Sequence, residues 1–393
     1  MRVWLGSAAM ALALTGCVAG YDGPVETAPV QENPVTFVTP PERDPADLQV
    51  LFWSDEQRSA RFRDMESWFE GHEVKGALEP RALPEGAPLD DALAAEIRSL
   101  MESANAAGVM VLQNGEIRYE AYGLGFGPEQ RWTSFSVAKS FTSTLLGAAI
   151  QDGFIGSLQD PVTQYIPELA GSAYEGVTVE QLATMTSGVA WNEDYTDPES
   201  DVAKMASFVL EYGEDAMVAQ MKELPREAPP GEKWVYKTGE TNLIGLLVEN
   251  AVGLPLAAYA KDKIVDPAGF EGDLFWMSDP RGGSIGGCCL SIRLADYARM
   301  GQFALEGGLG AVPAGWFNEA GDSKVDFDRP GFGYGYQWWV YQGGYGAQGI
   351  FGQSITIIPE ENLVVAVVSN WPTATSDARG QWYRLALKIA AAE

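Results

Sequence analysis

The order of strand-forming and helix-forming segments constrains the fold of this chain more than any other feature. Residues 108–112 and 117–122 are β-rich and flank Asn114-Gly115, a pair that favours a tight hairpin turn. Strand-forming composition returns only near the end of the chain, in three runs at 334–341, 349–358 and 363–369. Residues 158–330 between these groups are mostly helical patterns broken by glycine and proline. The pattern predicts an α/β (α+β) fold, in which antiparallel strands distant in sequence share a sheet and a mostly helical domain is inserted.

Helical patterns adjoin the strand-forming runs, at residues 90–104, at 136–150 and from 376 onward. We therefore predict a globular domain over 48–393. Its α/β part comprises about 48–150 and 331–393, and its helical part comprises about 151–330. A cleft between two such parts is the usual place for a binding site.

Charge and histidine content exclude two classes of function. The chain has 54 acidic and 26 basic side chains, a formal charge of -28, which repels phosphate backbones. We therefore expect no nucleic-acid partner. It has one histidine, His72, so it cannot build a multi-histidine metal site, and it has a single candidate for the base of a Ser-His-Asp triad. We interpret His72 as a packing or surface residue and expect no metal and no cofactor.

The first 47 residues have the composition of a targeting segment followed by a tether. Arg2 precedes the uncharged run 3–15, which is too short to span a bilayer and suits a signal peptide over 1–16. The run ends in Leu-Thr-Gly-Cys17, which resembles the bacterial lipoprotein lipobox and implies acylation at Cys17. A plain signal peptide with a chance cysteine is the alternative. The proline-rich residues 17–47 suit an extended linker.

By the same resemblance the protein is a lipoprotein on the periplasmic side of the bacterial cell envelope, anchored in a membrane. Val18, rather than Asp, follows the cysteine, which favours the outer membrane. Of the three cysteines, Cys288 and Cys289 remain. Adjacent cysteines rarely bond to each other, because their Cα atoms are about 3.8 Å apart across a trans peptide. We expect them to be unpaired, small apolar core residues.

Two serine motifs compete for the role of nucleophile. Gly-Gly-Ser284-Ile-Gly286 matches G-x-S-x-G, a pattern that needs a strand before it, a helix after it and a histidine later in the chain. Residues 278–283 have turn composition, and no histidine follows His72. We therefore interpret residues 282–287 as a backbone turn.

The second motif, Ser136-Val-Ala-Lys139, does not require histidine. The two side chains lie on one face of a helix whose N-terminus favours developing negative charge. Neighbouring apolar residues such as Phe135 and Phe141 can desolvate Lys139 and lower its pKa. An ordinary helix start with a capping serine and a solvated lysine is the alternative. Tyr236, which precedes a helical pattern at 243–252, could act as a phenolate base beside that lysine.

Taken together, these motifs resemble the serine β-lactamase/penicillin-recognising superfamily, in its class C and esterase branch, and most closely its 6-aminohexanoate-dimer hydrolase group. The resemblance covers about residues 50–393. The segments that carry it are Trp53…Gln57-Arg58, 135–141, 185–189, 193–198, 236–242, 286–289 and 349–353. It implies a β-lactamase/transpeptidase-like fold, with an antiparallel sheet flanked by helices and a helical inserted domain.

The resemblance also implies the roles of individual residues. Ser136 would be the acylated nucleophile, with Lys139 and Tyr236 as the general base and acid pair. The backbone N–H groups of Ser136 and Ala347 would form the oxyanion hole. The residues implied in substrate binding are Tyr195, Thr238 and Ile350. For Tyr195, a packed loop aromatic is the alternative.

The chain departs from the family pattern at two places. Lys237-Thr-Gly239 spells K-T-G, but it precedes a helix and overlaps the tyrosine motif, so we do not take it as the family's third motif. Residues 346–349 contain no Lys or His where a β-lactamase binds the substrate carboxylate. This favours small-molecule esters or amides as substrates, hydrolysed through an acyl-enzyme.

Two alternatives and two open points remain. The alternatives are a β-lactamase or D-Ala-D-Ala carboxypeptidase, and a non-catalytic penicillin-binding-like sensor lipoprotein. Ser291 stands where a polar residue often appears in this group, and its role stays open, as does the oligomeric state.

Overall fold

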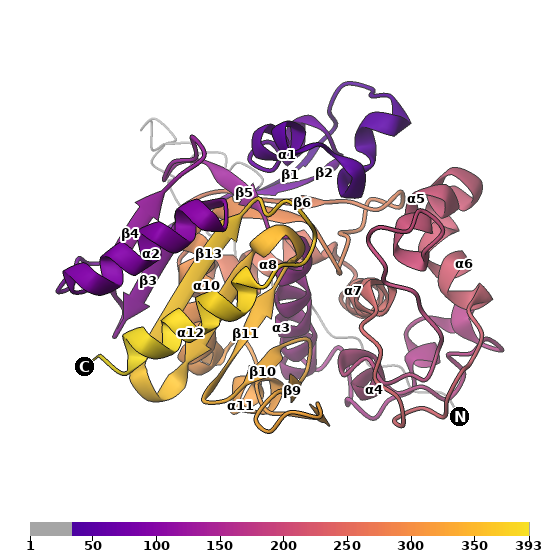
Figure 1. Cartoon of the computed structure of the whole chain (residues 1–393). Coiled ribbons are helices and arrows are strands. Elements are labelled where there is room, and N and C mark those ends of the chain that lie inside the picture. Colours follow the sequence, from indigo (N-terminus) through magenta and orange to yellow (C-terminus); the bar gives the residue numbers. More distant parts are fainter. Residues whose placement is uncertain (1–33, 393) are drawn as a thin grey trace, which may run out of the picture. The chain divides into compact units, whose positions relative to one another are not determined.

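An eight-stranded antiparallel sheet lies at the centre of the computed structural model, which describes residues 34–392 (Figure 1). Its strand order is β4-β3-β13-β12-β11-β10-β9-β8. The strands are β3 (Ala106–Gln113), β4 (Glu116–Tyr122), β8 (Val325–Asp326), β9 (Gly333–Tyr334), β10 (Trp339–Tyr341), β11 (Gly344–Gln348), β12 (Ser354–Ile358) and β13 (Leu363–Ser369). The last strand of the chain, β13, pairs with the early strand β3, so segments distant in sequence share one sheet, as expected.

The predicted hairpin is present between β3 and β4. Both turn residues have positive φ, +54° at Asn114 and +78° at Gly115, which is the geometry that an Asn-Gly pair favours. The late strand pattern at 334–341 is interrupted, because residues 335–338 separate β9 from β10. The strand expected over 349–358 is confined to β12, and residues 350–352 form a short 3₁₀ turn before it.

Both faces of the large sheet are covered by helices. On β13, Val365 and Val367 pack with α2 (Asp91–Ser103) and α12 (Ala378–Ala390), and these two helices contact each other (Figure 1). The alternate residues of β13 belong to the main core, on the face that contacts α10 (Leu294–Leu305). This alternation follows from the two-residue period of a strand. The expected architecture, an antiparallel sheet flanked by helices, is confirmed.

A second, five-stranded antiparallel sheet has the order β1-β2-β6-β7-β5. Its strands are β1 (Val35–Val38), β2 (Gly71–Val74), β5 (Arg131–Thr133), β6 (Leu274–Met277) and β7 (Leu290–Arg293). Two boundaries predicted from sequence are corrected by this sheet. The globular unit begins before residue 48, because β1, which lies in the segment assigned to the linker, pairs with β2. The region 151–330 also contributes β6 and β7, which are too short to give a strand pattern.

Helix α3 (Ala138–Gln151) lies in the main core and contacts α7 (Thr238–Val252). The other α-helices are α1 (Asp55–Arg61), α4 (Val179–Ala183), α5 (Asp201–Tyr212), α6 (Ala216–Glu223), α8 (Leu256–Ala260), α9 (Asp266–Ala268) and α11 (Trp316–Ala320). Within residues 34–392 no single helix meets the length and hydropathy expected of a membrane span; only α7 and the segment Leu256–Ala268, as a pair bent by 75°, do so together.

The two adjacent cysteines differ from the expectation of unpaired thiols. Cys288 and Cys289 form a disulfide between neighbouring residues. The backbone of Cys289 has φ +73°, in the left-handed region. Cys17, in contrast, lies outside the described residues.

Candidate active site

Ser136 lies in a turn between a strand and a helix. Strand β5 ends at Thr133, and the single 3₁₀ turn η4 (Phe135–Val137) leads directly into α3. Phe135 has φ +44°, a conformation that a bulky residue rarely adopts and that marks local strain beside the partly exposed serine. Ser134 fixes this turn to β7: its N–H donates to the Leu290 carbonyl at 2.7 Å, and its hydroxyl accepts from the Leu290 N–H at 3.2 Å.

Lys139 lies in the first turn of α3 and is 1% exposed. Its ammonium donates to the hydroxyl of Thr238 at 2.9 Å and to the carbonyl of Gly287 at 2.7 Å. Burial lowers the pKa of Lys139 to about 8, and the nearby charge of Glu193 opposes part of that shift. Near neutral pH a part of the Lys139 population is therefore neutral and can accept a proton, whereas an exposed lysine is almost fully protonated.

The carbonyl that accepts from Lys139 reaches it because residue 287 is glycine. The N–H of Gly287 donates to the side-chain oxygen of Asn242 at 2.8 Å, which holds the loop against the first turns of α7. A Cβ at this position would lie 2.8 Å from the Thr238 carbonyl oxygen, closer than real Cβ atoms approach. The sequence offered no signal for this contact, because the group involved is a backbone carbonyl.

Tyr236 lies beside both residues of the S-x-x-K motif. The Ser136 side chain is close enough to the Tyr236 phenol to affect the pKa of that phenol, and the ring centroid of Tyr236 is 5.3 Å from the Lys139 ammonium. Burial, with the charge of Glu193, raises the pKa of the Tyr236 phenol, while the Ser136 side chain and the charge of Arg379 act in the opposite direction. The ring also stacks on Trp339, with 5.5 Å between centroids. The structure thus brings Ser136, Lys139 and Tyr236 together.

Glu193 is a residue of this site to which the sequence assigned no role, although it lies in the quoted segment 193–198. Its carboxylate accepts from the Thr238 N–H at 2.9 Å and from the Tyr195 hydroxyl at 2.9 Å. The Thr238 hydroxyl and the Trp191 indole N–H also donate to it. One carboxylate therefore fixes both Tyr195 and Thr238, two residues assigned to substrate binding.

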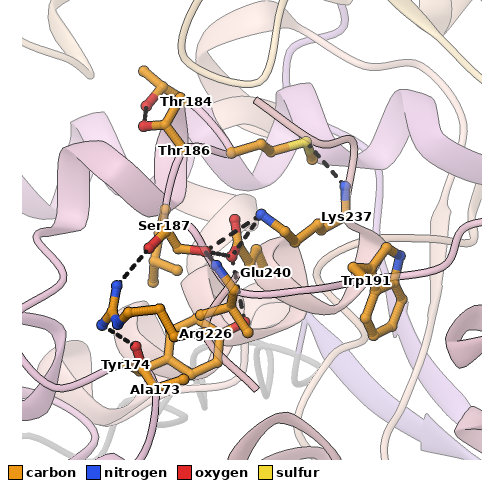
Figure 2. Close-up of polar contacts among 12 residues, drawn as sticks. Ala173, Tyr174, Thr184, Thr186, Ser187, Trp191, Arg226, Lys237 and Glu240 are labelled. Atoms are coloured by element: carbon orange, nitrogen blue, oxygen red, sulfur yellow. Dashed lines mark hydrogen bonds and ion pairs between the residues drawn. The ribbon is translucent and has the colours of Figure 1, made fainter. Parts of the chain in front are cut away.

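The Lys237 side chain lies in a buried polar network with Ser187 and Glu240 (Figure 2). Its ammonium lies 3.3 Å from the Glu240 carboxylate and 3.3 Å from the Ser187 hydroxyl, and both charged side chains are 0% exposed. The Tyr174 hydroxyl donates to the same carboxylate at 3.3 Å, and Arg226 donates to the Ser187 carbonyl at 3.2 Å. Lys237 therefore anchors the backbone between Tyr236 and Thr238 and supplies no cation to the site.

Strand β11 and the residues after it also border the site. Strand β11 contacts η4, and Ala347 is a buried residue of β11. Any side chain at Gly349 would collide with the Ser134 carbonyl oxygen, so this glycine permits the close approach. Ile350 is buried in the short turn that follows. The role of the Ala347 N–H in an oxyanion hole stays a prediction.

The competing motif does not form a nucleophile elbow. Ser284 is buried, its hydroxyl accepts from the Ala257 N–H at 3.0 Å, and its own N–H donates to Glu249 at 2.7 Å. Strand β7, rather than a helix, follows it. His72 lies buried on β2, with its ring centroid 5.1 Å from that of Phe37, far from either serine motif in the sequence. Ser291 is buried on β7, and its hydroxyl has no hydrogen-bond partner among the described residues.

Comparison with known proteins places the chain in a family. A family model described as Beta-lactamase matches residues 93–282 and 293–390. The 6-aminohexanoate-dimer hydrolase of Paenarthrobacter ureafaciens is 30% identical over 305 residues, which cover 72% of this chain and 78% of that protein. A β-lactamase of Pseudomonas fluorescens is 28% identical over 184 residues, 44% of this chain and 48% of that protein.

Solved structures show the same fold. A structure from Bacillus anthracis, described as a candidate 6-aminohexanoate-dimer hydrolase, superposes with a TM-score of 0.78 at 20% identity. The superposition covers 90% of this chain and 98% of that one. The chain therefore belongs to the Beta-lactamase family and is a hydrolase of the serine β-lactamase superfamily, similar to 6-aminohexanoate-dimer hydrolases.

Proposed function

We propose that this hydrolase cleaves an ester or amide bond through an acyl-enzyme on Ser136. The observation that carries the proposal is the buried Lys139, which lies one helical turn after Ser136, has a pKa of about 8, and has its ammonium 5.3 Å from the ring centroid of Tyr236. A nucleophile, a proton acceptor and a cation that can stabilise a phenolate thus lie in one site.

In the first half of the reaction, the Ser136 hydroxyl gives its proton to the Tyr236–Lys139 pair as its oxygen bonds to the substrate carbonyl carbon. The negative charge that forms on the carbonyl oxygen is stabilised by the N–H groups of Ser136 and Ala347. The pair then returns the proton to the leaving alcohol or amine as its bond to carbon breaks. In the second half, water gives a proton to the pair as its oxygen bonds to the acyl carbon. The pair returns that proton to the Ser136 oxygen as the ester bond breaks, which releases the acid and restores the free serine.

The names of the relatives suggest which substrates to test. A linear amide such as the 6-aminohexanoate dimer is the first candidate, because the relative covering 72% of this chain carries that name. Relatives called β-lactamases make β-lactams the second candidate. Within the chain, however, β11 and residues 349–353 contain no Lys or His that could bind the carboxylate of a β-lactam. We therefore favour linear esters and amides over β-lactams.

The decisive experiment pairs active-site labelling with a substrate panel. A fluorophosphonate probe is expected to label the wild type and not the Ser136→Ala variant. The panel comprises p-nitrophenyl esters, nitrocefin and the 6-aminohexanoate dimer, and Ser136→Ala should lower kcat/KM by about a thousandfold or more. The neighbouring motif supplies a control, since Ser284→Ala should retain labelling. Full ester hydrolysis by Ser136→Ala would exclude the mechanism.

For the cellular location, we propose a lipid anchor at Cys17, which lies outside the described residues. The support is the Leu-Thr-Gly-Cys17 sequence after an uncharged run. Wild-type protein is expected in the membrane fraction of the cell envelope, with processing blocked by globomycin, whereas Cys17→Ala should be released. A Cys17→Ala protein that stays fully bound to the membrane would disprove the anchor.

A further inference from the structure

Cys288 and Cys289, which form a disulfide, lie beside the proposed active site. The carbonyl of the preceding residue, Gly287, accepts from the Lys139 ammonium at 2.7 Å. A disulfide between adjacent residues closes a ring that contains their peptide bond, so it restricts rotation about ψ of Cys288 and φ of Cys289. The path of the chain immediately after the carbonyl that binds the lysine is therefore fixed covalently.

The same segment is bonded on its other side to the turn that carries the proposed nucleophile. The Leu290 carbonyl accepts from the Ser134 N–H at 2.7 Å, and the Leu290 N–H donates to the Ser134 hydroxyl at 3.2 Å. The N–H of Cys289 donates to the Phe135 carbonyl at 3.5 Å. One short stretch of chain, residues 287–290, thus contacts both the lysine and the turn of the nucleophile. We call this stretch the disulfide loop.

The backbone of the disulfide loop has a conformation that depends on the ring. Cys289 has φ +73°, in the left-handed region that residues other than glycine rarely adopt. The closed ring holds φ at this residue, whereas two separate thiols would leave it free to return to negative φ. Such a change would redirect the chain between Gly287 and Leu290, and so would separate the contact to Lys139 from the contacts to Ser134.

We propose that Cys288 and Cys289 are a redox modification site: their disulfide holds Lys139 and the turn of Ser136 in the active arrangement, and reduction to two thiols reversibly lowers hydrolysis. The inference rests on the proposed function at Ser136. Cys288 is partly exposed, whereas Cys289 is 4% exposed, so we expect a reductant to attack the sulfur of Cys288. The reductant is a dithiol, either a small molecule or a protein with a pair of thiols.

The modification is a thiol–disulfide exchange. One thiol of the reductant loses its proton and bonds to the Cys288 sulfur as the bond to Cys289 breaks, and the Cys289 thiolate takes up a proton. The second thiol then loses its proton and bonds to the first sulfur of the reductant, which releases Cys288 as a thiolate that is protonated in turn. The reductant leaves as a disulfide, and an added disulfide such as oxidised glutathione reverses the reaction.

The test measures activity and thiol content on the same samples of the full chain. Wild-type protein is assayed with a p-nitrophenyl ester before and after dithiothreitol treatment, then denatured, alkylated with iodoacetamide and analysed by mass spectrometry. Cys288 and Cys289 should resist alkylation before reduction and be alkylated after it. Reduction should lower kcat by about 5- to 30-fold, the population ratio that corresponds to the cost of left-handed backbone. Oxidised glutathione should restore the activity.

Variants separate the effect of the ring from that of the thiols. Cys288→Ser with Cys289→Ser should be as weakly active as the reduced wild type and should not respond to dithiothreitol. Cys288→Ser with Cys289→Gly lacks the same bond, but glycine adopts positive φ freely, so this variant should regain part of the activity. Cys17→Ala removes the third cysteine of the chain and should respond to reduction as the wild type does.

Four outcomes would overturn the proposal. They are alkylation of both cysteines without reduction, an unchanged kcat in fully reduced wild type, a loss of activity that reoxidation does not reverse, and no gain from glycine at position 289. The reversible response of the wild type keeps the test valid if a variant does not fold. Ester hydrolysis that Ser136→Ala retains would instead refute the proposed function, so the two failures can be told apart.

Discussion

The Lys139 ammonium donates to the Thr238 hydroxyl at 2.9 Å, and that hydroxyl in turn donates to the Glu193 carboxylate. A partly buried negative charge is thereby linked, through one threonine, to the lysine beside the nucleophile. The charge of Glu193 raises the pKa of Lys139, against the larger effect of burial, and it also raises the pKa of Tyr236. Glu193 thus raises the proton affinity of both groups that would activate Ser136.

Replacing Glu193 with Gln should shift the pH dependence of ester hydrolysis. If neutral Lys139 is the active form, wild-type kcat/KM rises with pH through a pKa of about 8. Gln keeps one acceptor oxygen for one of the two Thr238 donors and carries no charge, so this rise should move to lower pH. Asp194→Asn removes an exposed charge from the next residue and should leave the profile in place. A Glu193→Gln profile that is unchanged, or moved to higher pH, would contradict this account.

Lys139 should reduce the stability of the fold at neutral pH. Its pKa falls from 10.5 in the unfolded chain to about 8 in the folded one, so only the unfolded chain holds this proton between those values. Wild-type stability therefore rises with pH across that window. Relative to Lys139→Met, the wild type should gain about 2–3 kcal/mol of unfolding free energy between pH 7 and pH 10. Urea unfolding of both proteins measures this difference. A difference in unfolding free energy that does not change with pH would contradict the lowered pKa.

Replacing only Lys237 of the buried Lys237–Glu240 pair should lower the unfolding free energy far more than replacing both residues. Lys237→Met leaves a fully buried carboxylate without its cation and should cost about 3–5 kcal/mol of unfolding free energy. The double variant with Glu240→Leu should recover most of that loss. Lys233→Met breaks an exposed pair, to Glu227 at 2.7 Å, and should cost less than about 1 kcal/mol. Similar losses for Lys233→Met and Lys237→Met in urea unfolding would contradict the burial argument.

Local sequence signals predicted the parts of the fold that local geometry determines. The Asn114-Gly115 pair specifies its own turn, because both residues accept positive φ. The spacing of Ser136 and Lys139 likewise follows from helical periodicity alone. That Tyr236 lies beside them was inferred from a family resemblance, and the structure places its ring centroid 5.3 Å from the Lys139 ammonium.

The remaining features depend on contacts between distant segments and leave no pattern in the sequence. Strands β6 and β7 are four residues each, too short to show a period. The Gly287 carbonyl that binds Lys139 has no side chain to identify it. Arg379 is one basic residue in the pattern of a surface helix, and only the tertiary fold brings its guanidinium to the Gly349 carbonyl that follows β11.

Glu249 connects the stability of the fold to pH near neutrality. This partly buried carboxylate, near the end of α7, accepts from the N–H groups of Ser284 and Leu256, each at 2.7 Å. It thereby fixes the loop that continues to Gly287 and the Lys139 contact. Burial raises the pKa of Glu249 from 4.5 to about 7, and these two hydrogen bonds offset only part of the effect.

The sign of the resulting pH dependence is fixed by that raised pKa. Between pH 4.5 and about 7 the folded protein holds a proton that the unfolded chain has released, so stability falls as pH rises through this window. Glu249→Gln retains the acceptor oxygen without the ionisation. It should therefore be more stable than the wild type by up to about 3 kcal/mol at pH 8, and by less than about 1 kcal/mol at pH 5. Glu360→Gln, at an exposed glutamate, should show no such change with pH. If Glu249→Gln were less stable than the wild type at pH 8, the ionised carboxylate would be stabilising the loop, and the raised pKa would be excluded.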